Sequence, residues 1–148
     1  MLNILSIDDE HLIRELVSEI LIKDGHAVLT AEGGEAGVKA FEEAKEAGRP
    51  FDVVITDLGM PYVDGREVTR KIKESSPETP VILLTGWGGR LKAEGDIPAQ
   101  VDLVLGKPPK LWELREGLHK VISTERRVLS TKSEKKKPSQ REKGTERK

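Results

Sequence analysis

The chain has 148 residues, no cysteine and no uncharged apolar run long enough for a membrane span, which excludes a disulfide framework, a thiolate metal site and a membrane protein. Its net charge of −1 conceals two unlike parts, because residues 1–123 carry −7 and residues 124–148 carry +6. The second part lacks aromatic residues, so we expect a domain over 1–123 and a basic, disordered tail over 124–148. The start of the chain does not resemble a signal peptide, so a cytoplasmic protein is expected.

The first third of the chain predicts two strands, each followed by a helix. Residues 2–7 are mostly apolar and predict a strand. Apolar residues then recur at helical spacing as far as Gly25, a suitable stop for a helix. Residues 26–31 predict a second strand and residues 35–47 a second helix. The apolar face expected for the first helix is made of Leu12, Ile13, Leu16, Val17, Ile20 and Leu21, and the inner face expected for the second is made of Ala36, Ala40, Phe41 and Ala44.

The middle of the chain has the strongest strand signals. Residues 53–55 are all β-branched and form a run too short for a helix, which predicts a strand buried on both faces. Residues 66–75 predict a third amphipathic helix, with Val68 and Ile72 on its inner side. Residues 80–85 predict another fully buried strand.

The last elements complete an α/β pattern. Residues 86–100 contain four glycines and a proline, and predict only a short or irregular fourth helix. Residues 101–105 predict a fifth strand, and apolar residues from Leu111 to Ile122 predict a final amphipathic helix. Strands that alternate with helices give a parallel sheet covered on both faces. The predicted fold is therefore a flavodoxin-like (βα)5 three-layer sandwich. Folds of this kind have a five-stranded parallel sheet in the order 2-1-3-4-5, which is the order expected here.

Polar residues follow four of the predicted strands. Asp8 and Asp9 follow the first strand, Asp57 the third, Thr85 ends the fourth, and Lys107 follows the fifth. Parallel α/β sheets place their sites at the carboxyl ends of the strands, so these groups are expected to converge. Three clustered carboxylates repel one another unless a cation such as Mg²⁺ neutralises them. Such a site has the parts for phosphoryl transfer, in which Asp57 attacks in line and forms an acyl phosphate.

Five separated motifs carry a resemblance to a known family. They are Asp8-Asp9, Asp57-Leu58-Gly59-Met60-Pro61 with Asp64-Gly65, Leu84-Thr85-Gly86, and Lys107-Pro108. In this order they resemble the receiver domain of two-component response regulators, over about residues 2–122. The resemblance implies a signalling protein that accepts a phosphoryl group from a phosphohistidine on a sensor histidine kinase or a histidine phosphotransfer protein. It also implies a downstream protein target.

The resemblance assigns a role to each motif. Asp57 is the phosphoacceptor, Thr85 is the switch hydroxyl, and Lys107 pairs with the phosphoryl group. Mg²⁺ is the implied cofactor, and its ligands are Asp8, Asp9, Asp57 and the carbonyl of Gly59. The protein would catalyse its own phosphorylation and dephosphorylation rather than turn over an external substrate. The family usually has an aromatic residue three positions before the lysine, coupled to the threonine, whereas this sequence has Val104 there.

Other interpretations use the same residues. Asp8 or Asp9 could cap the first helix, and Glu10 is expected to face solvent. An aspartate-nucleophile phosphohydrolase of the haloacid-dehalogenase kind would want a second aspartate two residues after the first, where Gly59 stands. The remaining alternative is a vestigial receiver that binds protein or nucleic acid weakly through its basic tail, whose lysines include Lys135, Lys136 and Lys137.

Overall fold

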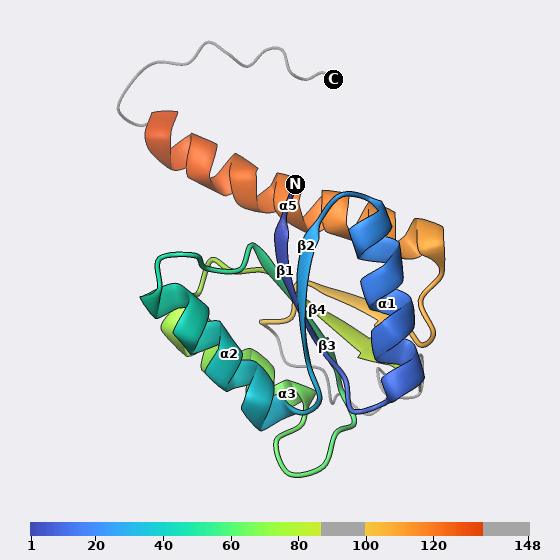
Figure 1. Ribbon diagram of the computed structural model, residues 1–148. Coiled ribbons are helices and arrows are strands. Elements are labelled where there is room, and N and C mark those ends of the chain that lie inside the picture. Colours follow the sequence, from blue (N-terminus) through green and yellow to red (C-terminus); the bar gives the residue numbers. More distant parts are fainter. Residues whose placement is uncertain (87–99, 135–148) are drawn as a thin grey trace.

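The structure is a computed structural model that describes residues 1–86 and 100–134. Five parallel strands form one sheet in the order β2-β1-β3-β4-β5, which confirms the predicted flavodoxin-like sandwich. The strands are β1 (Asn3–Ile7), β2 (Ala27–Ala31), β3 (Val53–Asp57), β4 (Val81–Thr85) and β5 (Leu103–Gly106). The helices described are α1 (His11–Lys23), α2 (Gly34–Glu46), α3 (Gly65–Ser75) and α5 (Leu111–Glu134). Figure 1 shows α1 and α5 on one side of the sheet, and α2 and α3 on the other.

The three central strands β1, β3 and β4 are buried on both faces, as their branched apolar residues require, whereas the edge strands β2 and β5 are more exposed. Successive residues of a strand point to opposite faces, so Ile4 and Leu5 of β1 belong to different cores. Ile4 packs with the inner residues of α1 and α5, which include Val17, Leu21, Leu114, Leu118 and Val121. Leu5 packs with those of α2 and α3, which include Phe41, Val68 and Ile72. The inward positions predicted for the third helix are therefore confirmed.

Two inward positions predicted for the first helices are wrong. The side chain of Leu12 in the first turn of α1 is 79% exposed, and Ala36 in α2 is also exposed. The buried residue beside Ala36 is Gly37, where an added Cβ would lie 2.3 Å from Cδ1 of Ile7. A glycine lets α2 approach β1 closely, and hydropathy alone gives no signal for such a contact.

The last helix is longer than the apolar pattern predicts. It runs to Glu134, past residue 123, and Figure 1 shows its C-terminal turns extending beyond the sheet. Residues 124–134 contain neither glycine nor proline, so nothing in them stops a helix. The division into a domain over 1–123 and a tail over 124–148 stays a prediction, and residues 135–148 lie outside the described part.

Two other expectations concern the rest of the chain. The short or irregular fourth helix falls almost wholly on residues 87–99, which lie outside the described residues. Among the helices that the structure describes, none combines the length and apolar character that a bilayer crossing needs.

Candidate functional site

The strand ends of β1, β3, β4 and β5 meet around one open hollow of about 570 Å³. Asp9, Asp57, Gly59, Thr85 and Lys107 line it. Asp8 lies beside it, because one carboxylate oxygen from each of Asp8, Asp9 and Asp57 falls within 4.8 Å of the others. The structure thus brings together all the site residues predicted from the sequence.

The three carboxylates differ in their access to solvent. Asp8 is 2% exposed and Asp57 is 4% exposed, whereas Asp9 is exposed. Oδ1 of Asp8 accepts a hydrogen bond from the backbone N–H of Glu10 at 2.9 Å, and Oδ1 of Asp57 accepts one from Gly59 at 3.4 Å. Among the described residues, Oδ2 of Asp8 is the one buried side-chain polar atom without a hydrogen-bond partner. Neither aspartate caps α1, because its N-cap residue is Glu10 and no side-chain cap hydrogen bond is made.

Lys107 supplies the positive charge that contacts the acid cluster. Its Nζ lies 3.2 Å from Oδ1 of Asp57 and 3.4 Å from Oδ2 of Asp8, the second being a charge contact rather than a hydrogen bond. A third carboxylate, that of Glu10, lies closer still, with Oε1 at 2.5 Å. The backbone N–H of Lys107 donates to the carbonyl of Thr85 at 3.0 Å, which fixes the lysine beside the end of β4.

The loop after Asp57 is held by backbone contacts. The N–H of Leu58 donates to the carbonyl of Leu84 at 3.0 Å, and the N–H of Gly65 donates to the carbonyl of Leu58 at 2.9 Å. Only a glycine fits at position 65, because an added Cβ would lie 2.5 Å from the backbone oxygen of Asp57. The start of α3 therefore packs directly against the backbone of Asp57.

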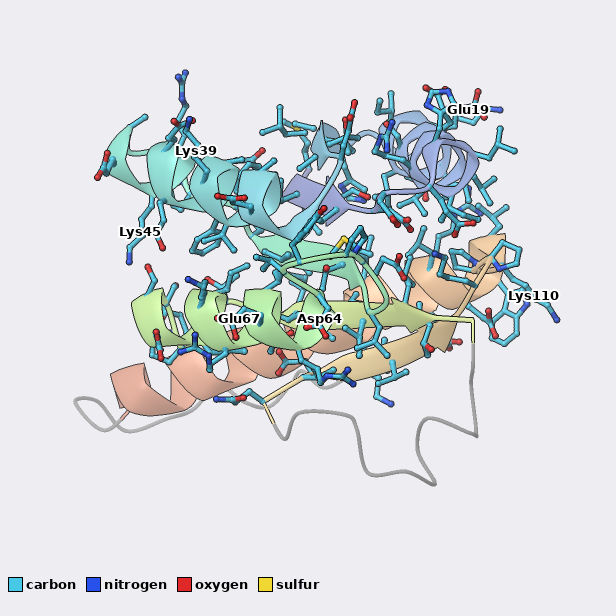
Figure 2. The ribbon with its side chains drawn as sticks, turned by 90° about the horizontal axis from the view of Figure 1, so that it is seen from below. Glu19, Lys39, Lys45, Asp64, Glu67 and Lys110 are labelled. Atoms are coloured by element: carbon cyan, nitrogen blue, oxygen red, sulfur yellow. The ribbon has the colours of Figure 1, made fainter. Side chains whose placement is uncertain are left out.

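Asp64 is the N-cap of α3 rather than a member of the acid cluster. Figure 2 shows Asp64 at the start of this helix. Its Oδ1 accepts hydrogen bonds from the backbone N–H groups of Arg66 at 3.0 Å and Glu67 at 3.1 Å. A capping carboxylate satisfies N–H groups that have no partner within the helix. Asp64 thus holds α3, and with it the loop that carries Gly59, in place.

Burial changes the charge balance of the acid cluster. It raises the pKa of Asp8 to about 6, and the negative charge of Asp57 adds to this while Lys107 opposes it. Burial also raises the pKa of Asp57, against the charge of Lys107. For Lys107, burial alone would lower the pKa, but the hydrogen bond to Glu10 and the charges of Asp57 and Asp8 raise it above its usual value.

We expect Asp8→Asn to stabilise the metal-free protein at pH 7. The folded state binds the Asp8 proton more tightly than the unfolded state, whose pKa is near 3.8, so this stability is present below pH 3.8 and is lost as the pH rises through about 6. The gain at pH 7 should be on the order of 1–3 kcal/mol. Chemical denaturation in a chelator, at pH 4 and at pH 7, measures it.

The matched control for this prediction is Asp52→Asn, at the exposed amino end of β3. Its free energy of unfolding should equal that of the wild type at both pH values. An Asp8→Asn protein that is less stable than the wild type at pH 7 would contradict the prediction. It would show that the Asp8 carboxylate stabilises the folded metal-free protein.

The donor set fits a hard divalent cation. Three carboxylates converge on one point, and the buried Oδ2 of Asp8 has no hydrogen bond that would have to be broken first. Mg²⁺ prefers oxygen ligands of this kind and keeps several waters, which the open hollow can admit. The residues present therefore suit Mg²⁺.

Two contacts of the site were not anticipated from the sequence. Glu10 does face solvent as expected, with its side chain 60% exposed, but its carboxylate also contacts Lys107. The one available signal was its place as the third consecutive acid after β1. Val104, in the position where an aromatic residue is usual, is partly buried and packs with the cluster of Leu58 and Leu83.

Comparisons with known proteins agree with the geometry. Residues 4–119 match the family described as the response regulator receiver domain. The transcriptional regulatory protein ResD of Bacillus subtilis is 34% identical over 128 residues, which cover 86% of this chain and 50% of ResD. The chain thus spans half the length of that relative.

Solved structures show the same likeness. A response regulator receiver domain protein from Clostridium thermocellum has 33% identity and a TM-score of 0.76, covering 86% of this chain and 99% of that one. The response regulator protein TrrA from Thermotoga maritima, solved in complex with Mg(2+)-BeF, has 33% identity and a TM-score of 0.65, covering 82% of this chain and 99% of TrrA.

Proposed function

The chain belongs to the response regulator receiver family, and on that premise we propose that Asp57 is its phosphoacceptor. Members of the family are phosphoacceptor signalling domains of two-component systems, and this chain is one of them. The observation that supports Asp57 is its position. It ends the central strand β3, is 4% exposed, lines the hollow, and lies beside both the acid pair and Lys107.

The proposed reaction moves one phosphoryl group. A carboxylate oxygen of Asp57 forms a bond to phosphorus while the bond from phosphorus to the imidazole nitrogen of a donor phosphohistidine breaks, and the electron pair leaves with the imidazole. The ammonium of Lys107 then pairs with the phosphoryl oxygens, and the hydroxyl of Thr85 bonds one of them. Hydrolysis of the acyl phosphate returns Asp57 to its carboxylate form.

Asp8, Asp9 and Asp57, with the carbonyl of Gly59, would hold Mg²⁺. When bound, the cation offsets the repulsion among these carboxylates and the charge of the incoming phosphoryl group. The protein's own part is to hold the oxygen ligands in place. The backbone N–H of Glu10 orients Asp8, and the anchored loop after β3 orients Asp57 and Gly59.

Signalling then depends on Thr85 and on what surrounds it. Because Val104 replaces the usual aromatic residue and packs with Leu58 and Leu83, a switch in this protein would act without an aromatic side chain at that position. We propose a sensor histidine kinase or histidine phosphotransfer protein as phosphodonor, a downstream protein as target, and the cytoplasm as location. No observation on the described residues favours the alternative of a basic tail that binds protein or nucleic acid.

The test of this function uses the full chain, Mg²⁺ and a small phosphodonor such as acetyl phosphate. Intact mass spectrometry should show the addition of one phosphoryl group. The adduct should be lost when a chelator is present, because the carboxylates then repel the donor. Absence of an adduct with every divalent cation tried, or an adduct that the chelator does not change, would contradict the proposal.

A further inference from the structure

The carboxylate closest to Lys107 is that of Glu10. Its Oε1 lies 2.5 Å from Nζ, whereas the nearest oxygens of Asp57 and Asp8 lie at 3.2 and 3.4 Å. The Glu10 side chain is 60% exposed and that of Lys107 is 10% exposed. Glu10 thus reaches from the rim of the hollow inward to a nearly buried ammonium group.

The backbone of Glu10 is fixed on both sides. Its N–H donates to Oδ1 of Asp8 at 2.9 Å, and its carbonyl accepts from the N–H of Arg14 at 3.0 Å, in the first turn of α1. Glu10 is the N-cap residue of that helix, but its side chain makes no cap hydrogen bond. The carboxylate is therefore free of helix capping and turned instead toward the end of β5.

We propose that Glu10 is a positioning residue for Lys107, an inference that rests on the phosphoacceptor function proposed above. An ammonium group has three N–H donors, and here three carboxylates surround it. Asp8 and Asp57 belong to the proposed ligands of Mg²⁺, whereas Glu10 does not. When Asp8 and Asp57 turn to a cation, Glu10 is the partner that keeps Lys107 at the mouth of the hollow, where the phosphodonor enters.

Two substitutions of Glu10 distinguish the effect of its contact with Lys107 from the effect of its negative charge. Glu10→Gln keeps the length of the side chain and removes its charge, while Glu10→Asp keeps the charge and shortens the side chain by one methylene. If contact positions Lys107, both should slow phosphorylation by acetyl phosphate at saturating Mg²⁺ by about fivefold, the usual scale for coupling between charged neighbours. Glu15→Gln, an exposed glutamate of α1 outside the hollow, is the matched control and should keep the wild-type rate.

A binding measurement gives a readout that does not depend on phosphorylation. Without the Glu10 carboxylate, the ammonium of Lys107 pairs only with Asp8 and Asp57. It then competes with Mg²⁺ for these two carboxylates. Titration calorimetry should show that Glu10→Gln weakens Mg²⁺ binding by about fivefold in the wild-type background. With Lys107→Ala already in place the same change should cost at most about twofold, because only the distant charge is lost.

The outcomes distinguish this inference from the proposed function. Glu10→Asp with the wild-type rate beside a slow Glu10→Gln would mean that charge alone matters, and would overturn the inference. So would equal losses of Mg²⁺ affinity in the two backgrounds. In both cases a Mg²⁺-dependent adduct on the wild type would still support the phosphoacceptor function. Absence of that adduct would contradict the function, and the Mg²⁺ affinities from calorimetry would then test the role of Glu10 by themselves.

Discussion

Asp57→Asn should abolish the Mg²⁺-dependent phosphoryl adduct, which is the largest effect expected of any single change in this chain. An amide of the same shape cannot form the acyl phosphate, so the loss should exceed the detection range of intact mass spectrometry, on the order of a thousandfold. The fold should persist, because the substitution removes one of three mutually repelling carboxylates. Circular dichroism and thermal unfolding of the variant in a chelator check this second point.

Asp52→Asn provides the matched control at the opposite end of β3. Its Oδ2 accepts a hydrogen bond from the backbone N–H of Asn3 at 2.7 Å, and an asparagine oxygen can do the same. This variant should form the adduct at the wild-type rate. An adduct that persists on the Asp57→Asn protein would move the acceptor elsewhere, and peptide mapping of the modified chain would then show whether Asp8 or Asp9 carries it.

Lys107→Ala should slow phosphorylation by about 10²- to 10³-fold, the usual cost of removing one group that stabilises developing charge. It should also destabilise the metal-free protein by about 3 kcal/mol, because Asp8 and Asp57 are left buried without their counter-ion. Mg²⁺ should restore most of that stability and bind more tightly than to the wild type, since its competitor is gone. Stopped time courses of adduct formation and thermal unfolding with and without Mg²⁺ measure the two effects.

Lys73→Ala separates general destabilisation from loss of chemistry. Lys73 is nearly as buried as Lys107, and its Nζ bonds the carbonyl of Thr79 at 2.7 Å and Oδ2 of Asp102 at 2.9 Å. This network lies at the amino ends of β4 and β5, away from the hollow. The control should lose stability, keep its phosphorylation rate and gain nothing specific from Mg²⁺. A Lys107→Ala protein that behaved in the same way would have lost a structural ion pair only.

The sequence was sufficient for the sheet and for the convergence of the site. The strands of a parallel sheet are buried on both faces, so β3 and β4 appear as unbroken apolar runs that hydropathy detects. Polar residues that follow such runs must gather at the carboxyl edge. Asp57, Thr85 and Lys107 could therefore be placed together before any coordinates were known.

Other features depend on tertiary contacts that a single sequence does not encode locally. Gly37 is buried because α2 lies against Ile7, and no periodicity of α2 alone predicts that glycine rather than Ala36 faces inward. The contact between Glu10 and Lys107 joins long, flexible side chains that lie far apart in the sequence. The end of α5 was placed too early because the apolar pattern fades after Ile122, although the residues that follow favour a helix.

The spread of the site along the chain has a consequence for biosynthesis. A growing polypeptide presents Asp8, Asp9 and Asp57 well before the ribosome reaches Lys107, so the nascent sheet would first gather its acids without their counter-ion. Their repulsion works against early closure of β1 on β3. Free divalent cations in the cell, or docking of β1 only after β5 has emerged, would reduce this repulsion. The order in which the strands join the sheet would therefore depend on the charges that line the finished hollow.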